Sequence, residues 1–340
     1  MNHPFINHLI EQAKSIHGRV AIPDAVHDDR VMYAASEVHR FGWLDVVLVG
    51  SRAECRKMAE SIGVDIDGIE ILDADELPEF PDYCAEYGRI RAKENLSEQQ
   101  IDETMRDAAY LACMLHKQGV VDAVCSGVHY STSDIARPSI KILGMHPGVP
   151  TMTAASVAAF ERTPIGDNLV FVTADATILP APDAATLSEI AILAADAAKT
   201  FLSEVPRVAM LSFSTLGSAK HEAVDKVVQA LEMAKAKRPD LLIDGEFQID
   251  AAIVPHVAAK KVKRPSEVAG RANVLIWPSL EAGNIGMKSL MMMGRGTFVG
   301  ATFLGINGLV GDHSRGATTE ELVPYIAYVG AQIPTTTAQG

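Results

Sequence analysis

The sequence has little cysteine. Four occur in 340 residues, at Cys55, Cys84, Cys113 and Cys125. No two of them are separated by just two residues, so the spacing of zinc knuckles and thioredoxin-type redox sites is missing. Four thiols in a chain of this length are also too few for a disulfide framework. We therefore expect reduced thiols and a cytoplasmic protein.

The sequence also lacks long apolar runs and an excess of positive charge. No apolar run reaches the roughly 18–20 residues of a membrane span, and the amphipathic residues 1–19 carry no small-residue cleavage site. The 30 Lys and Arg against 43 Asp and Glu give a formal charge of −13. Nucleic acids and anionic membranes need a concentrated positive face, so neither is an expected partner. A small phosphate-bearing ligand needs only a few local cations.

Several motifs that identify enzyme classes are missing. The chain has no GxxxxGK[ST], no GxSxG and no HExxH, and no GxGxxG follows a predicted strand. Residues 294–300, GRGTFVG, have the wrong spacing for a dinucleotide site. The eleven histidines do not cluster at ligand spacings. We therefore expect no metal site.

Short apolar runs alternate with helical patterns along the chain. The runs that predict strands are 18–24, 44–50, 121–127, 168–175, 207–213, 241–246 and 272–278. Residues 29–42, which end at Gly42, and a segment that begins at Ser51 predict helices. This alternation favours an α/β protein with mostly parallel sheets covered on both faces.

Three segments read as connections or ends. The acidic stretch 73–83 contains two prolines and predicts a surface connection. The loop 145–151 precedes a new pattern, and a prior of about 150 residues per domain suggests two domains, so we place a boundary there. Residues 334–340 predict a frayed tail.

The first candidate site follows the predicted strand 121–127. It offers Ser126, His129, Ser131 and Thr132 as hydrogen-bonding groups, and then Arg137. Free backbone N–H groups at a strand-to-helix junction bind anions, and an arginine adds a two-pronged phosphate contact. The alternative is that Ser131 or Thr132 only caps a helix and that Arg137 is a surface charge.

The second candidate, residues 213–224, also follows a predicted strand. Ser214, Thr215, Gly217 and Ser218 form a turn rich in hydroxyls and glycine before a helix. It is either a second anion-binding turn or an ordinary helix N-terminus.

The third candidate is Ser314-Arg315-Gly316, which leads into a helix that begins near Thr319. Thr318 and Glu321 have the spacing of a capping box. The same hydroxyl, cation and carboxylate at a helix N-terminus could also handle a nucleophile, and the two interpretations are compatible.

These segments, in this order, resemble the phosphate acetyl/butyryl transferase family. Other stretches agree with it: VAIPDAVHDDRV, the block at 121–138, MLSFSTLGSA, DLLIDGEFQIDAA (240–252), ANVLIWPSLEAGNIGMK (272–288) and HSRG. The resemblance covers about residues 18–325 and rests on the ordered set rather than on one motif.

The resemblance implies the fold, the reaction and the partners. It implies two three-layer αβα domains, similar to isocitrate/isopropylmalate dehydrogenase, with a cleft between them and a homodimer. The expected domains are 1–147 with 302–340, and 148–301. The implied reaction is acyl-CoA + phosphate = acyl phosphate + CoA, with the acyl group expected to be acetyl. Coenzyme A is a substrate, and neither a metal nor a tightly bound cofactor is implied.

The resemblance also assigns site residues. The expected catalytic residues are Ser314, Arg315, Arg137 and Glu321. The expected substrate-binding residues are Arg91, Ser126, Ser131, Thr132, Asn284 and Lys288. Arg91 fits the family's pattern better than Arg89. For Asn284 and Lys288, ordinary helix capping and surface charge remain equal alternatives.

Several positions depart from the family's pattern. Glu321 replaces its usual aspartate, residues 308–313 read GLVGDH, and Met287 replaces a tyrosine. Butyryl or propionyl transfer, and a degenerate member that binds CoA or acyl phosphate without turnover, therefore remain alternatives. A dehydrogenase of the related fold would need a dinucleotide fingerprint and paired aspartates, which the sequence does not offer.

Overall fold

The structure of the protein is a computed structural model, which describes residues 3–334. It forms two compact units. The first comprises Ile6–His146 and the chain from Ile306 onward, and the second comprises His3–Phe5 and Pro147–Gly305. The tail predicted at 334–340 lies, apart from Pro334, outside the described residues.

The sheet of the first unit has five strands in the order β3-β2-β1-β4-β11, and every neighbouring pair is parallel. The strands are β1 Arg19–Ile22, β2 Asp45–Val49, β3 Glu70–Leu72, β4 Ala123–Ser126 and β11 Val310–Asp312. β11 comes from the end of the chain and pairs with β4, so segments almost 200 residues apart end side by side.

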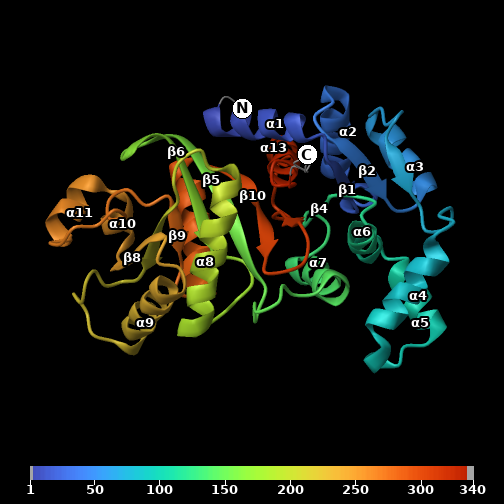
Figure 1. Cartoon of the computed structure of the whole chain (residues 1–340). Helices are drawn as coiled ribbons and strands as arrows, with labels where there is room; N and C mark the ends of the chain where they lie inside the picture. Colours follow the sequence, from blue (N-terminus) through green and yellow to red (C-terminus); the bar gives the residue numbers. More distant parts are fainter. Residues whose placement is uncertain (1–2, 335–340) are drawn as a thin grey trace, which may run out of the picture. The chain divides into compact units, whose positions relative to one another are not determined.

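Helices cover this sheet. They are α1 Pro4–Ile16, α2 Asp29–Phe41, α3 Arg52–Ile62, α4 Phe80–Ile90, α5 Glu98–Met105, α6 Ala108–Lys117, α7 Thr132–Pro138 and α13 Thr319–Gly330. Short 3₁₀ turns, η1 Asp24–Val26 and η2 Ala92–Glu94, and a π-helical turn, η3 Ser139–Leu143, complete the unit. α13 packs against α2, β1 and β4, while α6 packs against β1, β2 and β4. Figure 1 shows α2 and α13 on one side of the strands and α6 on the other.

The helix predicted over 29–42 illustrates why these residues fold as they do. Asp28 is its N-cap and accepts a hydrogen bond from the backbone N–H of Arg30, which satisfies one free donor of the first turn. Gly42 ends it with φ +65°, a left-handed conformation that glycine adopts without strain. Its apolar face buries Val31, Met32, Ala35 and Val38, among others.

The sheet of the second unit is mixed, with the order β10-β5-β6-β9-β7-β8. β5 runs antiparallel to both β6 and β10, and the remaining pairs are parallel. The strands are β5 Thr153–Thr163, β6 Gly166–Ala174, β7 Arg207–Leu211, β8 Leu242–Phe247, β9 Val274–Ile276 and β10 Thr297–Leu304.

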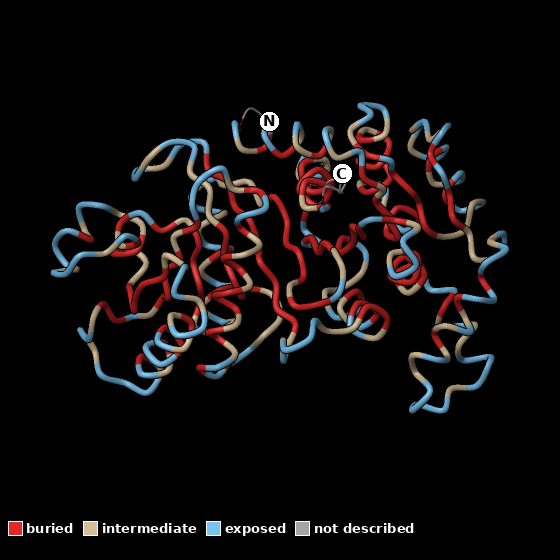
Figure 2. The backbone as a smooth tube through the Cα atoms, viewed as in Figure 1, coloured by how far each residue is buried: buried red, intermediate tan, exposed pale blue. Residues whose placement is uncertain are grey.

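Five helices belong to the second unit: α8 Ala184–Phe201, α9 Glu222–Lys237, α10 Ile249–Ile253, α11 Pro255–Lys261 and α12 Leu280–Gly294. α8 and α9 pack on each other and on the strands. A separate buried cluster joins Phe160, Leu211, Phe247 and Trp277 to residues of α10 and α12. Figure 2 shows the strands as the most deeply buried part of the fold.

The predicted α/β class with mostly parallel strands is confirmed, and every predicted strand exists. The prediction of one connection over 73–83 is wrong at its end, because α4 begins at Phe80. Pro81 lies in the first turn of this helix, where proline is tolerated. Strands β3, β5, β10 and β11 were not predicted. No helix within residues 3–334 is long and apolar enough to cross a bilayer.

Candidate functional site

The candidate site of the first unit lies where three neighbouring parallel strands end. Asp24 follows β1, Ser126 ends β4 and Asp312 ends β11. Because these strands are parallel neighbours, their carboxyl ends lie at one edge of the sheet, the usual place for ligands in α/β proteins. Two of the three predicted segments, the one around Ser131 and the one around Ser314, begin there.

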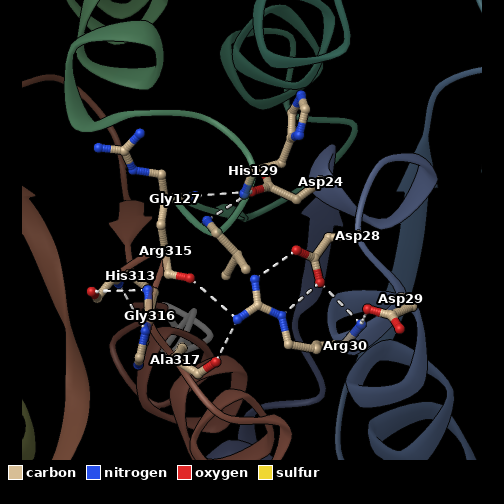
Figure 3. Close-up of polar contacts among 12 residues, drawn as sticks. Asp24, Asp28, Asp29, Arg30, Gly127, His129, His313, Arg315, Gly316 and Ala317 are labelled. Atoms are coloured by element: carbon tan, nitrogen blue, oxygen red, sulfur yellow. Dashed lines mark hydrogen bonds and ion pairs between the residues drawn. The ribbon is translucent and has the colours of Figure 1, made fainter.

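Asp24 organises the loop after β4, a role that the sequence did not indicate. The side chain is fully buried. It accepts hydrogen bonds from the Ser126 hydroxyl at 2.6 Å and from the backbone N–H groups of Gly127, Val128 and His129 at 3.1, 2.9 and 2.8 Å. Burial raises the pKa of Asp24, and these hydrogen bonds act in the opposite direction. Figure 3 shows the loop folded toward this carboxylate.

The structure therefore gives Ser126 a different role from the predicted one. Ser126 is 2% exposed, and its hydroxyl donates to Asp24 instead of pointing toward solvent. The N–H groups of residues 127–129 are also committed to Asp24, so they are not the free anion-binding donors that the sequence analysis expected. The prediction fails because the buried Asp24 carboxylate inside the loop already accepts the hydrogen bonds of these N–H groups.

The hydroxyls of Ser131 and Thr132 bind carboxylates rather than capping α7. Ser131 is the N-cap residue, but its hydroxyl makes no capping hydrogen bond and donates to Asp134 at 2.6 Å. The Thr132 hydroxyl donates to Asp312 Oδ2 at 2.8 Å. The two residues thus hold α7 to β11 and to its own first turn.

Arg137 and Arg315 both act on Asp134. The pKa of Asp134 is lowered, first by the hydrogen bond from Ser131 and then by the charges of Arg137 and Arg315. The Arg137 Nη1 atom lies 3.9 Å from Asp134 Oδ1, and the Arg137 side chain is 58% exposed. The charges of two arginines that are 178 positions apart in the sequence therefore act on one carboxylate.

Arg91 lies near the same region. It ends α4 and forms an ion pair with Glu94, to which Lys141 also approaches within 3.6 Å. Burial raises the pKa of Tyr110, and among the smaller effects the charge of Arg137 lowers it and that of Glu94 raises it. The charges of Arg137 and Glu94 thus both act on Tyr110, and Arg91 pairs with Glu94.

Ser314 and Arg315 lie in an exposed turn between β11 and α13. The Ser314 hydroxyl accepts a hydrogen bond from the backbone N–H of Gly316 at 3.3 Å. Glu321 accepts one from the backbone N–H of Thr318 at 2.8 Å, which confirms the predicted capping box at the start of α13. One Glu321 oxygen therefore already stabilises the helix.

Replacing Glu321 with alanine is expected to lower the free energy of unfolding by about 1 kcal/mol, because the backbone N–H of Thr318 loses its partner. Chemical denaturation measures this loss. Glu320→Ala is the matched control, since Glu320 carries the same charge in the same turn outside the capping box. Equal stability of the two variants would contradict the capping role.

Asp312 is a further residue that the sequence did not single out. It is 3% exposed, and its Oδ1 atom has no hydrogen-bond partner. That atom lies against the Cα of Gly127, where a Cβ would overlap it. Burial raises the pKa of Asp312 to about 7, the Thr132 hydrogen bond lowers it, and the charge of Asp24 raises it further.

Asp312→Asn is expected to change how stability depends on pH. Because the folded state raises this pKa from 3.8 to about 7, the native protein holds the proton more tightly and loses stability as the pH rises through that window. Asparagine does not titrate, so the variant should gain stability relative to wild type between pH 4 and 7, by roughly 4 kcal/mol at most. Denaturation across this range measures it. An exposed control, Asp67→Asn, should leave the pH dependence unchanged.

Two other predicted residues belong to the second unit. Asn284 and Lys288 are exposed on α12, whose N-cap is Ser279. The Asn284 amide donates weakly to the backbone carbonyl of Ala176 at 3.4 Å. The N-capping alternative for Asn284 is thus wrong, since Ser279 caps the helix.

The turn Ser214–Ser218 is neither an open anion site nor a helix cap. Glu246 accepts hydrogen bonds from the Ser214 hydroxyl at 2.7 Å and from the backbone N–H of Gly217 at 2.8 Å. The cap of α9 is His221, whose Nδ1 atom accepts from the backbone N–H of Ala223. As at Asp24, the buried carboxylate of Glu246 accepts the hydrogen bonds that the sequence predicts for a bound anion.

Over residues 3–334, no group of three His, Cys, Asp or Glu side chains is arranged to hold a metal ion. The candidate site of the first unit offers the cations and hydroxyls described above, besides the buried carboxylates of Asp24 and Asp312. Arg91, Arg137 and Arg315 suit an anionic substrate, and Ser314 supplies a neutral donor beside them.

Comparisons with known proteins agree with this chemistry. The family described as Phosphate acetyl/butaryl transferase matches residues 4–329. A phosphate acetyltransferase from Thermoanaerobacterium thermosaccharolyticum is 40% identical over 328 residues, 96% of this chain and 98% of the relative. The crystal structure of a phosphotransacetylase from Streptococcus pyogenes is 34% identical, with a TM-score of 0.87 over 98% of this chain and 99% of that one.

One distant structure extends the likeness of the fold. A 4-hydroxythreonine-4-phosphate dehydrogenase from Burkholderia phymatum is 13% identical, with a TM-score of 0.52 over 94% of this chain and 98% of that chain. At this identity the likeness concerns the fold alone. The match at 4–329 spans almost all of the described chain, and the chain belongs to the phosphate acetyl/butaryl transferase family.

Proposed function

We propose that this chain is a phosphate acetyltransferase, which converts acetyl-CoA and phosphate into acetyl phosphate and CoA, and the reverse. Family membership and relatives named phosphate acetyltransferase support the reaction. The observation that carries the site assignment is that the charges of Arg137 and Arg315 both act on Asp134, with Arg137 3.9 Å from its carboxylate and Ser314 next to Arg315 in the chain. Two cations and a hydroxyl suit a reaction in which one substrate is phosphate and an oxyanion develops on the other.

In the proposed forward reaction, a phosphate oxygen attacks the thioester carbonyl carbon. The carbon–oxygen bond forms, the carbon–sulfur bond breaks, and its electron pair leaves on the sulfur of CoA, which takes up the proton that the attacking hydrogen phosphate gives up. Arg91 and Arg137 hold the phosphate, while Arg315 and Ser314 donate to the oxyanion and the leaving thiolate. The hydroxyls of Ser131 and Thr132, which the family resemblance assigns to substrate binding, donate to Asp134 and Asp312.

The sizes of the effects rank these residues. A thiol with a pKa of ~8.5 is a few per cent ionised at pH 7, so full deprotonation by a base gains only about 30-fold, or ~2 kcal/mol. Alignment of two bound substrates supplies ~7–11 kcal/mol, and cations at the developing charge supply several more. Arg137 and Arg315 therefore rank above Glu321, whose carboxylate also caps α13.

The proposal includes the features that the family resemblance implied. The two units correspond to two domains with the isocitrate/isopropylmalate dehydrogenase-like fold, near the boundaries 147/148 and 301/302. The proposal keeps Asn284 and Lys288 as substrate-binding residues. The enzyme is a cytoplasmic homodimer that uses CoA as a substrate and needs no metal or tightly bound cofactor.

The test is consumption of acyl-CoA thioesters, followed at the thioester absorbance, with phosphate or arsenate as acceptor. Acetyl-CoA is expected to turn over fastest in a panel that includes propionyl-CoA and butyryl-CoA, and omission of the acceptor should abolish the reaction. A preference for butyryl-CoA would contradict the acetyl assignment. Binding of CoA without turnover of any thioester would overturn the reaction and favour a degenerate, ligand-binding member of the family.

A further inference from the structure

Arg30 joins the first strand-to-helix segment of the chain to the turn that carries Ser314 and Arg315. It is the second residue of α2, which begins just after β1 and η1. Its Nη1 atom donates to the backbone carbonyl oxygens of Arg315 at 3.2 Å and of Ala317 at 2.6 Å. Figure 3 shows the Arg30 guanidinium between this turn and Asp28.

Asp28 fixes the orientation of that guanidinium. The Arg30 Nε atom donates to Asp28 Oδ1 at 3.0 Å, and Nη2 donates to Oδ2 at 2.7 Å, so the pair is bidentate. Burial raises the pKa of Asp28, but hydrogen bonding to Arg30 and its charge outweigh this and lower it. Asp28 is also the N-cap of α2, so the Asp28–Arg30 pair lies in the first turn of this helix.

The contact reaches the parts of the turn that matter for the proposed reaction. Arg30 binds the backbone oxygen of Arg315, the residue whose side chain we assign to the developing charge. The second hydrogen bond from Arg30 goes to the backbone carbonyl of Ala317, at the end of the turn. The backbone N–H of Ala317 donates to the backbone carbonyl of Ser314 at 2.9 Å, which closes the turn. Ser314, Arg315 and Gly316 are all exposed, so packing of their side chains supplies little restraint. Two charge-assisted bonds from a neighbouring element are thus well placed to fix the backbone there.

We propose that Arg30 is a positioning residue, which holds the backbone of the 314–317 turn so that the Arg315 guanidinium and the Ser314 hydroxyl face the substrate. It acts through Arg315 and does not itself touch the reacting atoms. The inference rests on the proposed function of the Ser314–Arg315 turn. Arg30 lies in the segment VAIPDAVHDDRV, which resembles the family's pattern, and the proposal gives this segment a physical role.

The test is a double-mutant cycle of Arg30→Met and Arg315→Ala, with steady-state rates for acetyl-CoA and phosphate. Methionine keeps the aliphatic length of the side chain and removes all five donors. Arg30→Met alone should lower kcat about 30-fold, because a small misplacement of a catalytic group costs up to about 100-fold. The KM values should change much less. In the Arg315→Ala background the same substitution should cost less than about threefold, because the group that Arg30 positions is gone.

Three further variants make the result specific. Arg30→Lys keeps one charged donor and should recover part of the lost kcat. Asp28→Asn keeps an N-cap acceptor but removes the charge that orients the guanidinium, so it should lower kcat in the same direction by a smaller factor. Arg40→Met, which removes an arginine–glutamate pair from the exposed end of the same helix, should leave kcat unchanged. Circular dichroism checks that each variant is folded.

The outcomes separate this inference from the proposed function. Wild-type kcat in Arg30→Met, or full multiplication of the two losses in the double variant, would overturn the positioning role. If Arg315→Ala keeps wild-type kcat, the proposed role of the turn fails instead, whatever Arg30 does. If Arg30→Met does not fold, the kcat values of Asp28→Asn and Arg30→Lys test the positioning role instead. Wild-type kcat in both variants would overturn the inference.

Discussion

Arg137→Ala is expected to lower kcat by at least about 100-fold while the chain stays folded. A loss of this size corresponds to about 2.7 kcal/mol of transition-state stabilisation, within the range for one cationic or hydrogen-bonding contact to developing charge. Arg137 contributes little to folding, because its side chain is 58% exposed and its ion pair with Asp134 is long, at 3.9 Å. Initial rates over a range of phosphate concentrations measure kcat and the KM for phosphate, and denaturation measures stability.

Arg89→Ala is the matched control for this experiment. Arg89 is also an exposed arginine paired with a carboxylate three residues away, Glu86, but the proposed mechanism does not use it. Its replacement should leave kcat within about twofold of wild type, since such surface pairs are worth little. Wild-type activity in Arg137→Ala would remove that residue from the proposed mechanism.

Elements with strong local signals could be predicted from the sequence. β1, α2 and β2 follow from an apolar run, a helical pattern that ends at Gly42, and a second apolar run, and the structure places all three within two residues of the prediction. Here local preference and tertiary packing agree, because the apolar face of α2 is the face that the sheet and α13 bury.

Elements whose structure depends on distant partners could not be predicted. β5 has alanine at four of its eleven positions, which gives no strand preference, yet it pairs along its length with β6 and β10. β11 has only three residues, too few for a periodic pattern, and it exists because β4 offers it an edge. The antiparallel pairs around β5 are also why the second sheet is mixed rather than parallel.

The same division holds for the candidate site. Ser314 and Arg315 were singled out by their position before a predicted helix and by the family resemblance, because β11 was not predicted. The rule that ligands bind at the carboxyl ends of strands led to Ser131 and Arg137, because it needs only strand positions and residue types. It assigned Ser126 to the substrate, however, since the sequence does not reveal which buried acceptor takes its hydroxyl. That acceptor, Asp24, is 102 positions away, and only the parallel pairing of β1 with β4 brings the two together.

Asp24→Ala is expected to destabilise the protein by about 4 kcal/mol or more. The substitution removes one acceptor group and leaves four donors, the Ser126 hydroxyl and three backbone N–H groups, without their partner inside the protein. Each unsatisfied buried donor costs about 1–3 kcal/mol, and a hydrogen bond to a charged group is worth about 1.5–3 kcal/mol. Relaxation of the loop and entry of water offset part of the sum, so the expected loss is well below four full penalties.

A graded series separates the carboxylate's charge from its geometry. Asp24→Asn keeps one oxygen for the three N–H groups, and its amide can donate to the Ser126 hydroxyl, so it should cost less than Asp24→Ala. Ser126→Ala removes a single donor and should cost about 1 kcal/mol. If Asp24→Ala is recovered only as unfolded chain, the order Asp24→Asn worse than Ser126→Ala still tests the argument, because only the former weakens all four bonds. Equal stability of Asp24→Asn and wild type would mean that the charge contributes nothing, and the loop after β4 would then need another cause for its inward fold.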